Sequence, residues 1–457
     1  MCSQVIRGSL DPVEKVALAF SGGGHRASLF ALGVLLYLTE AGKNRDVTSV
    51  SSVSGGSLTN GFVAQAGDFS SLTPNEFERR VVRPLAQQLA KRGTLWASWT
   101  TWAYVLALVT GFIATLFVWS LPMNWFARAF LFVVALAGWS FLLASRRGYV
   151  CGRTLRTALY SNDGKPTLLG EIQQSNVQHI ICATDLHAGE HVYFSGSFVC
   201  SYRLGWGRPA HLPLHVAIQA SAAYPGGFPP RWLRTARHGF EHGTENVPRY
   251  MVLSDGGVYD NMGDQWPIGI RSRKRRWPEH SHELHEPTEL VVVNASGPMG
   301  WTSVRTLSLP AIGEIFSLLR VIRVLYEKTT TTRRIALVDR FDRAAREGNG
   351  LGGALVMINQ SPFGVAEYFL ARETEWPDRA VRARTVLDLL GPDSREQWKQ
   401  IARSNACVKT TLSRLGTDVA ASLLYHGYVL AMANLNVILD YPLLAVPSMD
   451  RFRDMVS

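Results

Sequence analysis

Short apolar runs that predict strands alternate along the chain with longer runs that predict helices. Residues 15–20 form a short apolar run that ends in a glycine cluster, and residues 27–42 have the length and the closing glycine of a helix. Residues 46–53 are rich in β-branched side chains, and residues 57–67 predict a second helix. The order strand, turn, helix therefore occurs twice near the start of the chain.

The alternation resumes further along the chain. Five more apolar runs predict strands: NVQHIICATD (176–185), HVYFSG (191–196), YMVLSDGG (250–257), ELVVVNAS (289–296) and ALVMINQ (354–360). Helical segments separate these runs, including residues 214–223 and 309–328, and a low-complexity piece, TTTTRR, covers 329–334. Strands that alternate with helices predict an α/β fold with a mostly parallel sheet covered on both faces.

Two long apolar runs interrupt this pattern. No Asp, Glu, Lys or Arg occurs from Gly93 to Ala127; within this stretch lies the run from Trp96 to Leu121, and a second run, from Trp125 to Ala144, follows. Each has about 20 residues or more, which as a helix is roughly the 30 Å of a bilayer core. Tryptophans gather towards the ends of the runs, as they do at membrane interfaces.

Only residues 122–124 separate the two runs, which predicts a tight helical hairpin over 93–147. Basic residues lie on both flanks, at 91–92 and 146–147, so the positive-inside rule places both flanks in the cytosol. The prediction is a multi-pass membrane protein with two spans, in which the hairpin is inserted between residues 1–90 and 148–457 of one domain. An interfacial or re-entrant hairpin, or an apolar cap over a site, is the alternative.

Composition and charge add two constraints. The net charge of +11 favours anionic partners, and the five scattered cysteines, without a C-x-x-C pair, fit a reducing compartment. The N-terminus has neither the apolar core of a signal peptide nor the M-G start of a myristoylated chain. The basic run RSRKRRW, 271–277, predicts contact with an anionic lipid surface rather than with nucleic acid; an exposed solvated loop is the alternative.

A glycine-rich turn, Gly22, Gly23 and Gly24, follows the first predicted strand and opens a helix. Consecutive glycines let the backbone approach a ligand and direct several N–H groups at one anion, which suits a phosphate cradle or an oxyanion hole. The run lacks the G-K-[ST] of a P-loop, and Ala27 breaks the dinucleotide pattern G-x-G-x-x-G. A tight turn without a ligand is the alternative.

Ser54 follows the second predicted strand and nearly satisfies the nucleophile-elbow pattern G-x-S-x-G. Gly56 supplies the second glycine, while Ser52 stands in place of the first. Asp255 ends another predicted strand and precedes Gly256 and Gly257, where it is either a general base or the first residue of an Asx-turn.

Five segments in this order resemble the patatin-like phospholipases, which share a Ser–Asp dyad with the cytosolic phospholipases A2. The segments are SGGGHRA (21–27), SSVSGGSLTNG (51–61), ATDLHAGEHVYFSG (183–196), ASAAYPGGFPP (220–230) and SDGGVYDNMG (254–263). The resemblance implies a patatin-like three-layer α/β fold that needs no metal or cofactor. Residues 1–90 and 148–457 would then be the two parts of one hydrolase domain, which the positive-inside rule places in the cytosol.

The resemblance assigns roles residue by residue. Ser54 is expected to be the nucleophile, Asp255 its base, and the backbone around Gly22, Gly23 and Gly24 the oxyanion hole. Arg26 matches an arginine that the cytosolic phospholipases A2 associate with substrate phosphate; bracing of the glycine turn is the alternative. Gly56, Gly256 and Gly257 are expected to support the elbow and the dyad, and residues 224–228 resemble a loop that lines the acyl site.

The predicted function is a membrane-anchored serine hydrolase that cleaves acyl esters of glycerophospholipids or lysophospholipids through an acyl-serine. A neutral glyceride lipase with the same dyad and a non-catalytic membrane scaffold are alternatives. A Ser–Asp–His triad is also open, with His280, His282, His285 and His426 as its candidates, and so is a metal site built from His280, His282 and His285. The sequence does not address the oligomeric state.

Overall fold

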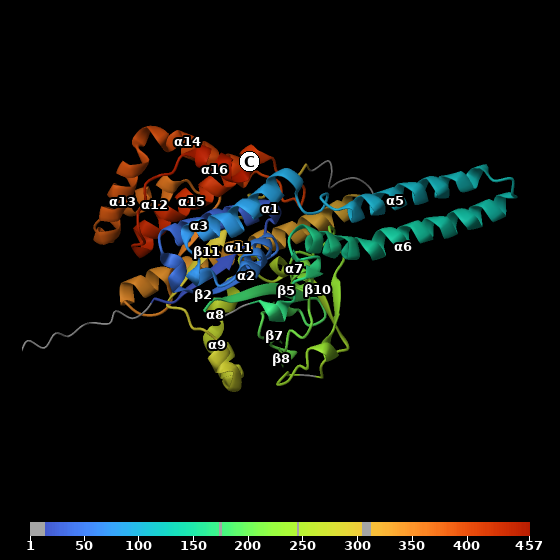
Figure 1. The fold of residues 1–457 in the computed structure, drawn as a ribbon, viewed down its shortest axis with the longest axis horizontal. Coiled ribbons are helices and arrows are strands. Elements are labelled where there is room, and N and C mark those ends of the chain that lie inside the picture. The colour runs from blue at the N-terminus through green and yellow to red at the C-terminus, as the bar shows by residue number, and fades with distance from the viewer. Residues whose placement is uncertain (1–13, 173–175, 245, 304–311) are drawn as a thin grey trace, which may run out of the picture.

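A computed structural model describes residues 14–172, 176–244, 246–303 and 312–457. A sheet of ten strands forms its centre (Figure 1). The strands are β1 (Val16–Phe20), β2 (Val47–Val53), β5 (Gln178–Asp185), β6 (Glu190–Phe194), β7 (Val199–Ser201), β8 (Gly205–Gly207), β9 (Arg231–Arg234), β10 (Tyr250–Asp255), β11 (Glu289–Asn294) and β12 (Gly352–Met357). β3 (Ser161–Asn162) and β4 (Lys165–Pro166) pair separately.

The sheet is parallel in its core and antiparallel on one side. The neighbouring strands β12, β11, β1, β2 and β5 all run parallel, as the alternation of strands and helices predicts. Beyond β5 the strands β6, β7 and β8 form antiparallel pairs, and β9 and β10 do so as well. The antiparallel part follows from short connections, since the loop between β5 and β6 is too short for a crossover helix.

Fifteen α-helices lie within the described residues. They are α1 (Gly24–Glu40), α2 (Gly55–Ala66), α3 (Pro74–Phe77), α4 (Arg83–Gln87), α5 (Trp99–Phe117), α6 (Trp125–Ala158), α7 (Leu214–Ser221), α8 (Gln265–Ile268), α9 (Ile270–Arg276), α11 (Ile312–Glu347), α12 (Pro362–Leu370), α13 (Pro377–Leu390), α14 (Arg395–Ala406), α15 (Thr417–Leu439) and α16 (Met449–Val456).

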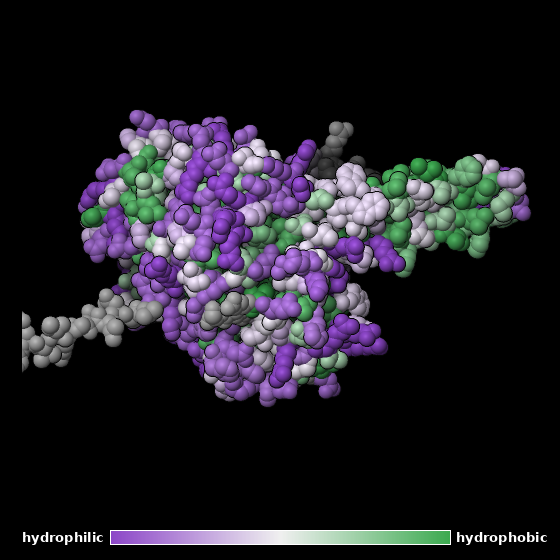
Figure 2. Space-filling model, in the orientation of Figure 1, coloured by the Kyte–Doolittle hydropathy of each residue, from purple (hydrophilic) through white to green (hydrophobic). Residues whose placement is uncertain are grey.

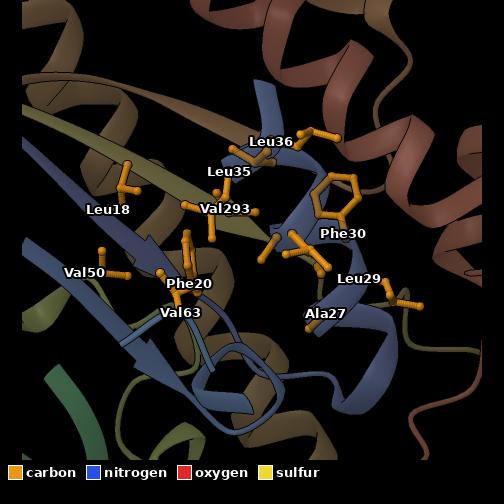
Figure 3. Close-up of a cluster of buried hydrophobic side chains, with 14 of the residues drawn as sticks. Leu18, Phe20, Ala27, Leu29, Phe30, Leu35, Leu36, Val50, Val63 and Val293 are labelled. Carbon is orange, nitrogen blue, oxygen red and sulfur yellow. The ribbon is translucent and has the colours of Figure 1, made fainter. Parts of the chain in front are cut away.

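Successive side chains of β1 point to opposite faces of the sheet. Each face packs against helices in its own hydrophobic core, which gives the fold three layers. Leu18 and Phe20 face the larger core, where they pack with side chains of α1 (Figure 3). Ala17 and Ala19 face the opposite side, where they pack with Leu337 and other residues of α11. The small alanines leave room for α11 on this face.

α1 and α15 pack at unusually close range on the larger core. A Cβ atom on Gly33 would lie 2.1 Å from the carbonyl oxygen of Leu424, and one on Gly427 would lie 2.2 Å from that of Phe30. Because each helix places a glycine against the backbone of the other, the two axes approach more closely than side chains would permit. α15 itself is apolar and long enough to cross a membrane, but most of its apolar stretch is buried in this core.

The expected hairpin is present as two helices, α5 and α6, that project from the body (Figure 1). Both are long and apolar enough to cross a membrane, and almost none of their apolar surface is buried. Figure 2 shows this projection as the most continuous hydrophobic surface on the visible face. Tyr104 and Trp139 link the helices by donating to the carbonyl oxygens of Leu143 and Leu108.

α6 does not end at the expected boundary at residue 147. It continues without a break to Ala158, and Cys151 and Leu155 of this last part are buried in the larger core. The hairpin is therefore continuous with the body through α6, while residues 93–98 join α5 to the body without a helix.

The basic run 271–277 is a helix rather than a loop, since α9 covers most of it and projects from the body (Figure 1). Arg273 packs over the rings of Tyr193 and Trp266, while Arg271 pairs with Glu286. Two of the basic side chains therefore interact with other residues of the protein. Contact of this helix with anionic lipid stays a prediction.

The contact between α1 and α15 generates a stability prediction. Gly33→Ala should lower stability by about 1–3 kcal/mol or more, because the added methyl group overpacks a contact between two backbones. Gly364→Ala in α12 is the matched control, since nothing lies within 4 Å of the added Cβ and alanine favours a helix by up to about 1 kcal/mol. Thermal unfolding in detergent compares the two variants, and equal melting temperatures would contradict the packing argument.

Candidate active site

The ends of β2 and β10 meet at one place on the sheet. β2 runs parallel to β5 as far as the pair Val53–Cys182. β10 then pairs with the next residues of β5 in the antiparallel sense, and Asp255 lies opposite Ala183. Because β6 occupies the other edge of β5, β2 and β10 share one edge and meet end to end. Ser54 and Asp255 are thereby brought together.

Ser54 lies in a strained turn between β2 and α2. Its backbone has φ 51° and ψ −116°, a conformation that costs a residue with a side chain roughly 1–3 kcal/mol. The N–H of Ser54 donates to Oγ of Ser221 at 2.9 Å, and the N–H of Gly56 donates to the carbonyl oxygen of Ser21 at 3.1 Å. These bonds hold the turn, and the side chain of Ser54 is half-buried while its neighbours are buried.

The residues that follow Ser54 leave no room for side chains. A Cβ atom on Gly55 would lie 2.2 Å from the carbonyl oxygen of Gly24, and one on Gly56 would lie 2.7 Å from Cβ of Phe20. The N-terminal turns of α1 and α2 therefore touch through their backbones, and the glycines make this contact possible.

Ser52 fits the position at which the pattern expects glycine. Its side chain is fully buried, and its hydroxyl group donates to the carbonyl oxygen of Ile180 at 3.1 Å. Oγ of Ser52 also accepts hydrogen bonds from the hydroxyl group of Ser57 and from Nδ2 of Asn60, at 3.0 and 2.8 Å. A buried hydroxyl group that makes its hydrogen bonds is well accommodated. Serine at position 52, in place of the glycine of the pattern, therefore leaves the turn intact.

Asp255 is buried and contacts Ser54. Its carboxylate accepts a hydrogen bond from the N–H of Gly257 at 2.7 Å and a second from the Ser54 side chain. Burial raises the pKa of Asp255 to about 7, and the two hydrogen bonds oppose this rise in part. The carboxylate is therefore far more basic than an exposed one, and it lies in contact with a hydroxyl group.

The glycines after Asp255 allow other chain segments to approach it. A Cβ atom on Gly256 would lie 2.4 Å from the carbonyl oxygen of Cys182. One on Gly257 would lie 2.7 Å from both the Asn261 side chain and the Tyr326 ring. Both positions thus require glycine for the Asp255 turn to pack against β5 and α11.

The glycine turn after β1 lies beside Ser54. A Cβ atom on Gly22 would be 3.3 Å from Cβ of Ser54, but the N–H of Gly22 already donates to the carbonyl oxygen of Asn261 at 3.0 Å. Among the described residues, no acceptor is found for the N–H groups of Gly23, Gly24 or Gly55. These three N–H groups belong to the N-terminal ends of α1 and α2, where helix dipoles favour negative charge.

Arg26 lies behind the glycine turn in a buried position. Its Nε donates to the carbonyl oxygen of Ala295 at 3.0 Å, and Nη1 donates to those of Val408 and Ala406 at 2.5 and 3.5 Å. Nη2 packs against Gly23. The guanidinium group thus ties the turn to β11 and to the segment after α14, which is the geometry of a brace.

No pattern in the sequence identifies, residue by residue, several side chains that lie near Ser54 and Asp255. Ser221 accepts the N–H of Ser54, and the carbonyl oxygen of Asn261 accepts the N–H of Gly22. His191 donates through Nε2 to the carbonyl oxygen of Gly256 at 3.0 Å. Ser221 and Asn261 do lie in segments that resemble the patatin-like family, whereas Tyr326 lies in a helix that the motifs do not include.

Three of the four histidines proposed for a triad or a metal site have other partners, and the fourth, His282, is exposed. His280 stacks on Trp206 and contacts Glu283, and His285 lies near the carbonyl oxygen of Thr48. His426 is buried on α15 and bonds to the carbonyl oxygen of Gln360. Across the described ranges, no group of three or more His, Cys, Asp or Glu side chains is arranged to hold a metal.

A parallel-core α/β sheet that presents a strained serine, a buried aspartate and a glycine turn at one edge defines a patatin-like hydrolase fold. The sequence model described as "Patatin-like phospholipase" matches residues 18–263, more than half of the chain. The chain belongs to the patatin-like phospholipase family, whose members are generally lipid acyl hydrolases. No curated protein matches the chain significantly.

Solved structures give weaker similarities. Human GIVD cytosolic phospholipase A2 matches with 14% identity and a TM-score of 0.30, over 65% of this chain and 48% of that one. A complex of the human enzyme with methyl γ-linolenyl fluorophosphonate and terbium chloride matches with 19% identity and a TM-score of 0.25, over 41% and 24%. VipD from Legionella pneumophila matches with 11% identity and a TM-score of 0.26, over 97% and 90%. The chain thus spans a quarter to a half of the human chains.

The pKa of Asp255 generates a pH prediction. Since protonated Asp255 cannot accept a proton from Ser54, hydrolysis of a soluble short-chain ester should rise with pH through about 7. His191 does not interfere in this range, because burial lowers its pKa to about 4 and keeps it neutral. A pH–rate profile of kcat/KM tests the prediction, and a flat profile between pH 5 and pH 9 would contradict it.

Proposed function

We propose that the protein is a membrane-anchored serine hydrolase that cleaves carboxylic ester bonds of glycerophospholipids or lysophospholipids through an acyl-serine. The contact between Ser54, in its strained turn, and the buried carboxylate of Asp255 carries this proposal. A neutral serine hydroxyl group is a weak nucleophile, and an adjacent base with a pKa near neutrality activates it.

In the first half of the reaction, Oγ of Ser54 attacks the carbonyl carbon of the ester while Asp255 takes the hydroxyl proton. The carbonyl π electrons move to the oxygen, which becomes an oxyanion. When the tetrahedral intermediate collapses, the bond to the alcohol breaks, and Asp255 returns the proton to the departing alkoxide. The products of this half are an acyl-serine and a lysophospholipid or a glycerophosphodiester.

In the second half, Asp255 accepts a proton from a water molecule whose oxygen attacks the acyl-serine. Collapse of the second tetrahedral intermediate breaks the bond to Oγ, which regains the proton from Asp255. The fatty acid leaves, and Ser54 and Asp255 return to their starting states. A single buried carboxylate thus serves both halves, as a base and then as an acid.

The oxyanion of each intermediate is stabilised by backbone N–H groups at the start of α1 and α2. Gly23, Gly24 and Gly55 support this role because their N–H groups have no acceptor among the described residues. Gly22 contributes space beside Ser54, since its own N–H is bonded to Asn261. A donor of this kind is typically worth about 3–4 kcal/mol in the transition state.

Arg26 acts on the reaction through the glycine turn. Its bonds to main-chain carbonyl oxygens support bracing, the alternative to a phosphate contact. No acidic side chain pairs with Arg26 among the described residues, and burial lowers its pKa to about 10, which leaves it charged at neutral pH. This positive charge adds to the favourable potential for an anion at the start of α1.

The catalytic proposal predicts that two substitutions abolish fatty acid release. Ser54→Ala and Asp255→Asn should each reduce release from phospholipid vesicles by at least about a thousandfold, because each removes one member of a unit that acts together. Ser71→Ala, which changes an exposed serine away from the site, is the matched control.

Product analysis by mass spectrometry and labelling by a fluorophosphonate provide the measurements. The native protein and the Ser71→Ala variant should label, whereas Ser54→Ala should not. Equal hydrolysis by all four proteins would refute the assignment, and failure of the native protein to label would support the non-catalytic scaffold.

Anchoring by α5 and α6 is supported by the exposed apolar surface of both helices and by Arg147 at the body end of α6. In this arrangement the hydrolase domain, which is formed by residues 1–90 and 148–457, lies on the cytosolic side. Its site then faces the leaflet that supplies the lipid.

The anchoring proposal predicts how the protein partitions. It should stay in the membrane pellet after washing with sodium carbonate at pH 11, because the apolar surface of two spans must remain in lipid. Replacing the tip and both apolar stretches, residues 99–144, by a short flexible linker should release the protein into the soluble fraction. Extraction of the native protein by carbonate would contradict two spans and favour an interfacial hairpin.

A further inference from the structure

The N-terminal half of α11 presents apolar side chains that are largely exposed. Six large hydrophobic residues in this segment are exposed, between 40% and 63% of their surface: Phe316, Leu318, Leu319, Val321, Val324 and Leu325. A surface helix of a soluble domain normally turns its apolar stripe to the core. Here the apolar residues lie around much of the helix, so packing against the sheet does not account for them.

The segment before α11 extends this apolar surface. Nη2 of Arg320 donates to the carbonyl oxygen of Gly300 at 2.9 Å, which holds residues 299–301 against the helix. Trp301 is completely exposed, and Met299 is exposed to 39%. A tryptophan presented beside arginines is typical of a membrane interface, where the ring and the cation each find a suitable environment.

This surface is continuous with the base of the hairpin through one loop, residues 224–229. Leu319 packs against Gly226 of the loop, with Cδ2 3.4 Å from the position of a Cβ atom there. Arg147 of α6 donates to the carbonyl oxygen of Gly227 at 3.4 Å. In Figure 1 the N-terminal end of α11 points towards the base of α5 and α6, and its C-terminal end points away from them.

The surface also borders the catalytic residues. The ring of Tyr326, directly after the apolar segment, packs against Gly257 and lies 5.7 Å from the ring of Tyr224. Its hydroxyl group is buried and has no hydrogen-bond partner among the described residues. Further along, Arg333 pairs with Asp260 and Asp264 at 3.3 and 3.0 Å, which fixes the second half of the helix to the body.

We propose that residues 316–325 of α11, together with residues 299–301, form a lipid-docking surface that lies in the headgroup region of the anchoring membrane beside the Ser54 site. The occupant is a bilayer surface rather than a protein, because the patch adjoins the hairpin and mixes apolar side chains with Arg320 and Arg323. The inference rests on the proposed anchoring and deepens it: the substrate lipid would pass from the leaflet along α11 to the dyad.

Lipid contact at Leu318 can be measured without any hydrolysis. A fluorophore is attached at Leu318→Cys in the full chain, after Cys2 and Cys407 are replaced by serine. Val381→Cys on α13 is the matched control, since Val381 is also exposed, to 58%, and α13 lies at the end of the body opposite the hairpin (Figure 1). Both proteins are reconstituted in vesicles of phosphatidylcholine and phosphatidylglycerol that contain spin-labelled phosphatidylcholine.

The spin label should quench the fluorophore at position 318 several-fold more strongly than the one at position 381. Equal quenching would overturn the proposal, and cross-linking of two chains through position 318 without quenching would assign the patch to a second copy instead. Since quenching needs no catalysis, strong quenching in a protein that releases no fatty acid would refute the proposed function and leave the docking surface standing.

A functional readout tests the same surface. The ratio of the rate on phospholipid vesicles to the rate on a soluble short-chain ester should fall about tenfold in Leu318→Glu. The introduced carboxylate would have to enter the lipid surface, and this opposes docking. The ratio should stay unchanged in Val381→Glu. An unchanged ratio in Leu318→Glu would overturn the proposal.

Discussion

The backbone contact between the first turns of α1 and α2 is the constraint on which the candidate site depends. Gly24 and Gly55 touch there, and no side chain fits at Gly55. Because β1 and β2 are parallel neighbours, the helices that follow them begin at the same edge of the sheet. Their N-terminal turns therefore lie together beside Ser54. The strained backbone of Ser54 lies at this contact, and the hydroxyl group of Ser54 contacts Asp255.

Local signals in the sequence were sufficient for the parts of the site that depend on local chain geometry. Strand–turn–helix patterns and glycines marked β1, β2, Ser54 and Asp255, because a turn of this kind needs residues of those types in order. Local patterns do not predict the hydrogen-bond acceptors of Gly22 and Arg26. Gly22 bonds to Asn261 and Arg26 bonds to carbonyl oxygens at 295 and 408, and only the assembled fold defines which distant carbonyl oxygen faces a given donor.

Tertiary contacts also explain why α11 is longer than its sequence predicts. The apolar pattern ended at residue 328, and the threonine-rich piece that follows favours extended structure. Within the fold, Leu337 and Phe341 pack on the small side chains of β1, and Arg333 pairs with two buried aspartates. These contacts outweigh a weak local preference. They also fix the far half of the helix, while the near half keeps its apolar side chains exposed.

Burial has two consequences for Asp255 in its proposed role as the base. It would make the carboxylate basic enough to accept a proton from serine, and it makes the charged form costly to hold near neutral pH. Tyr326 contributes to that burial from α11. α11 therefore covers the base with Tyr326 and presents exposed apolar side chains directly before it, at 316–325. Asp255 is already buried by the protein itself, so lipid contact at the exposed segment would bring substrate to a base whose basicity the fold sets.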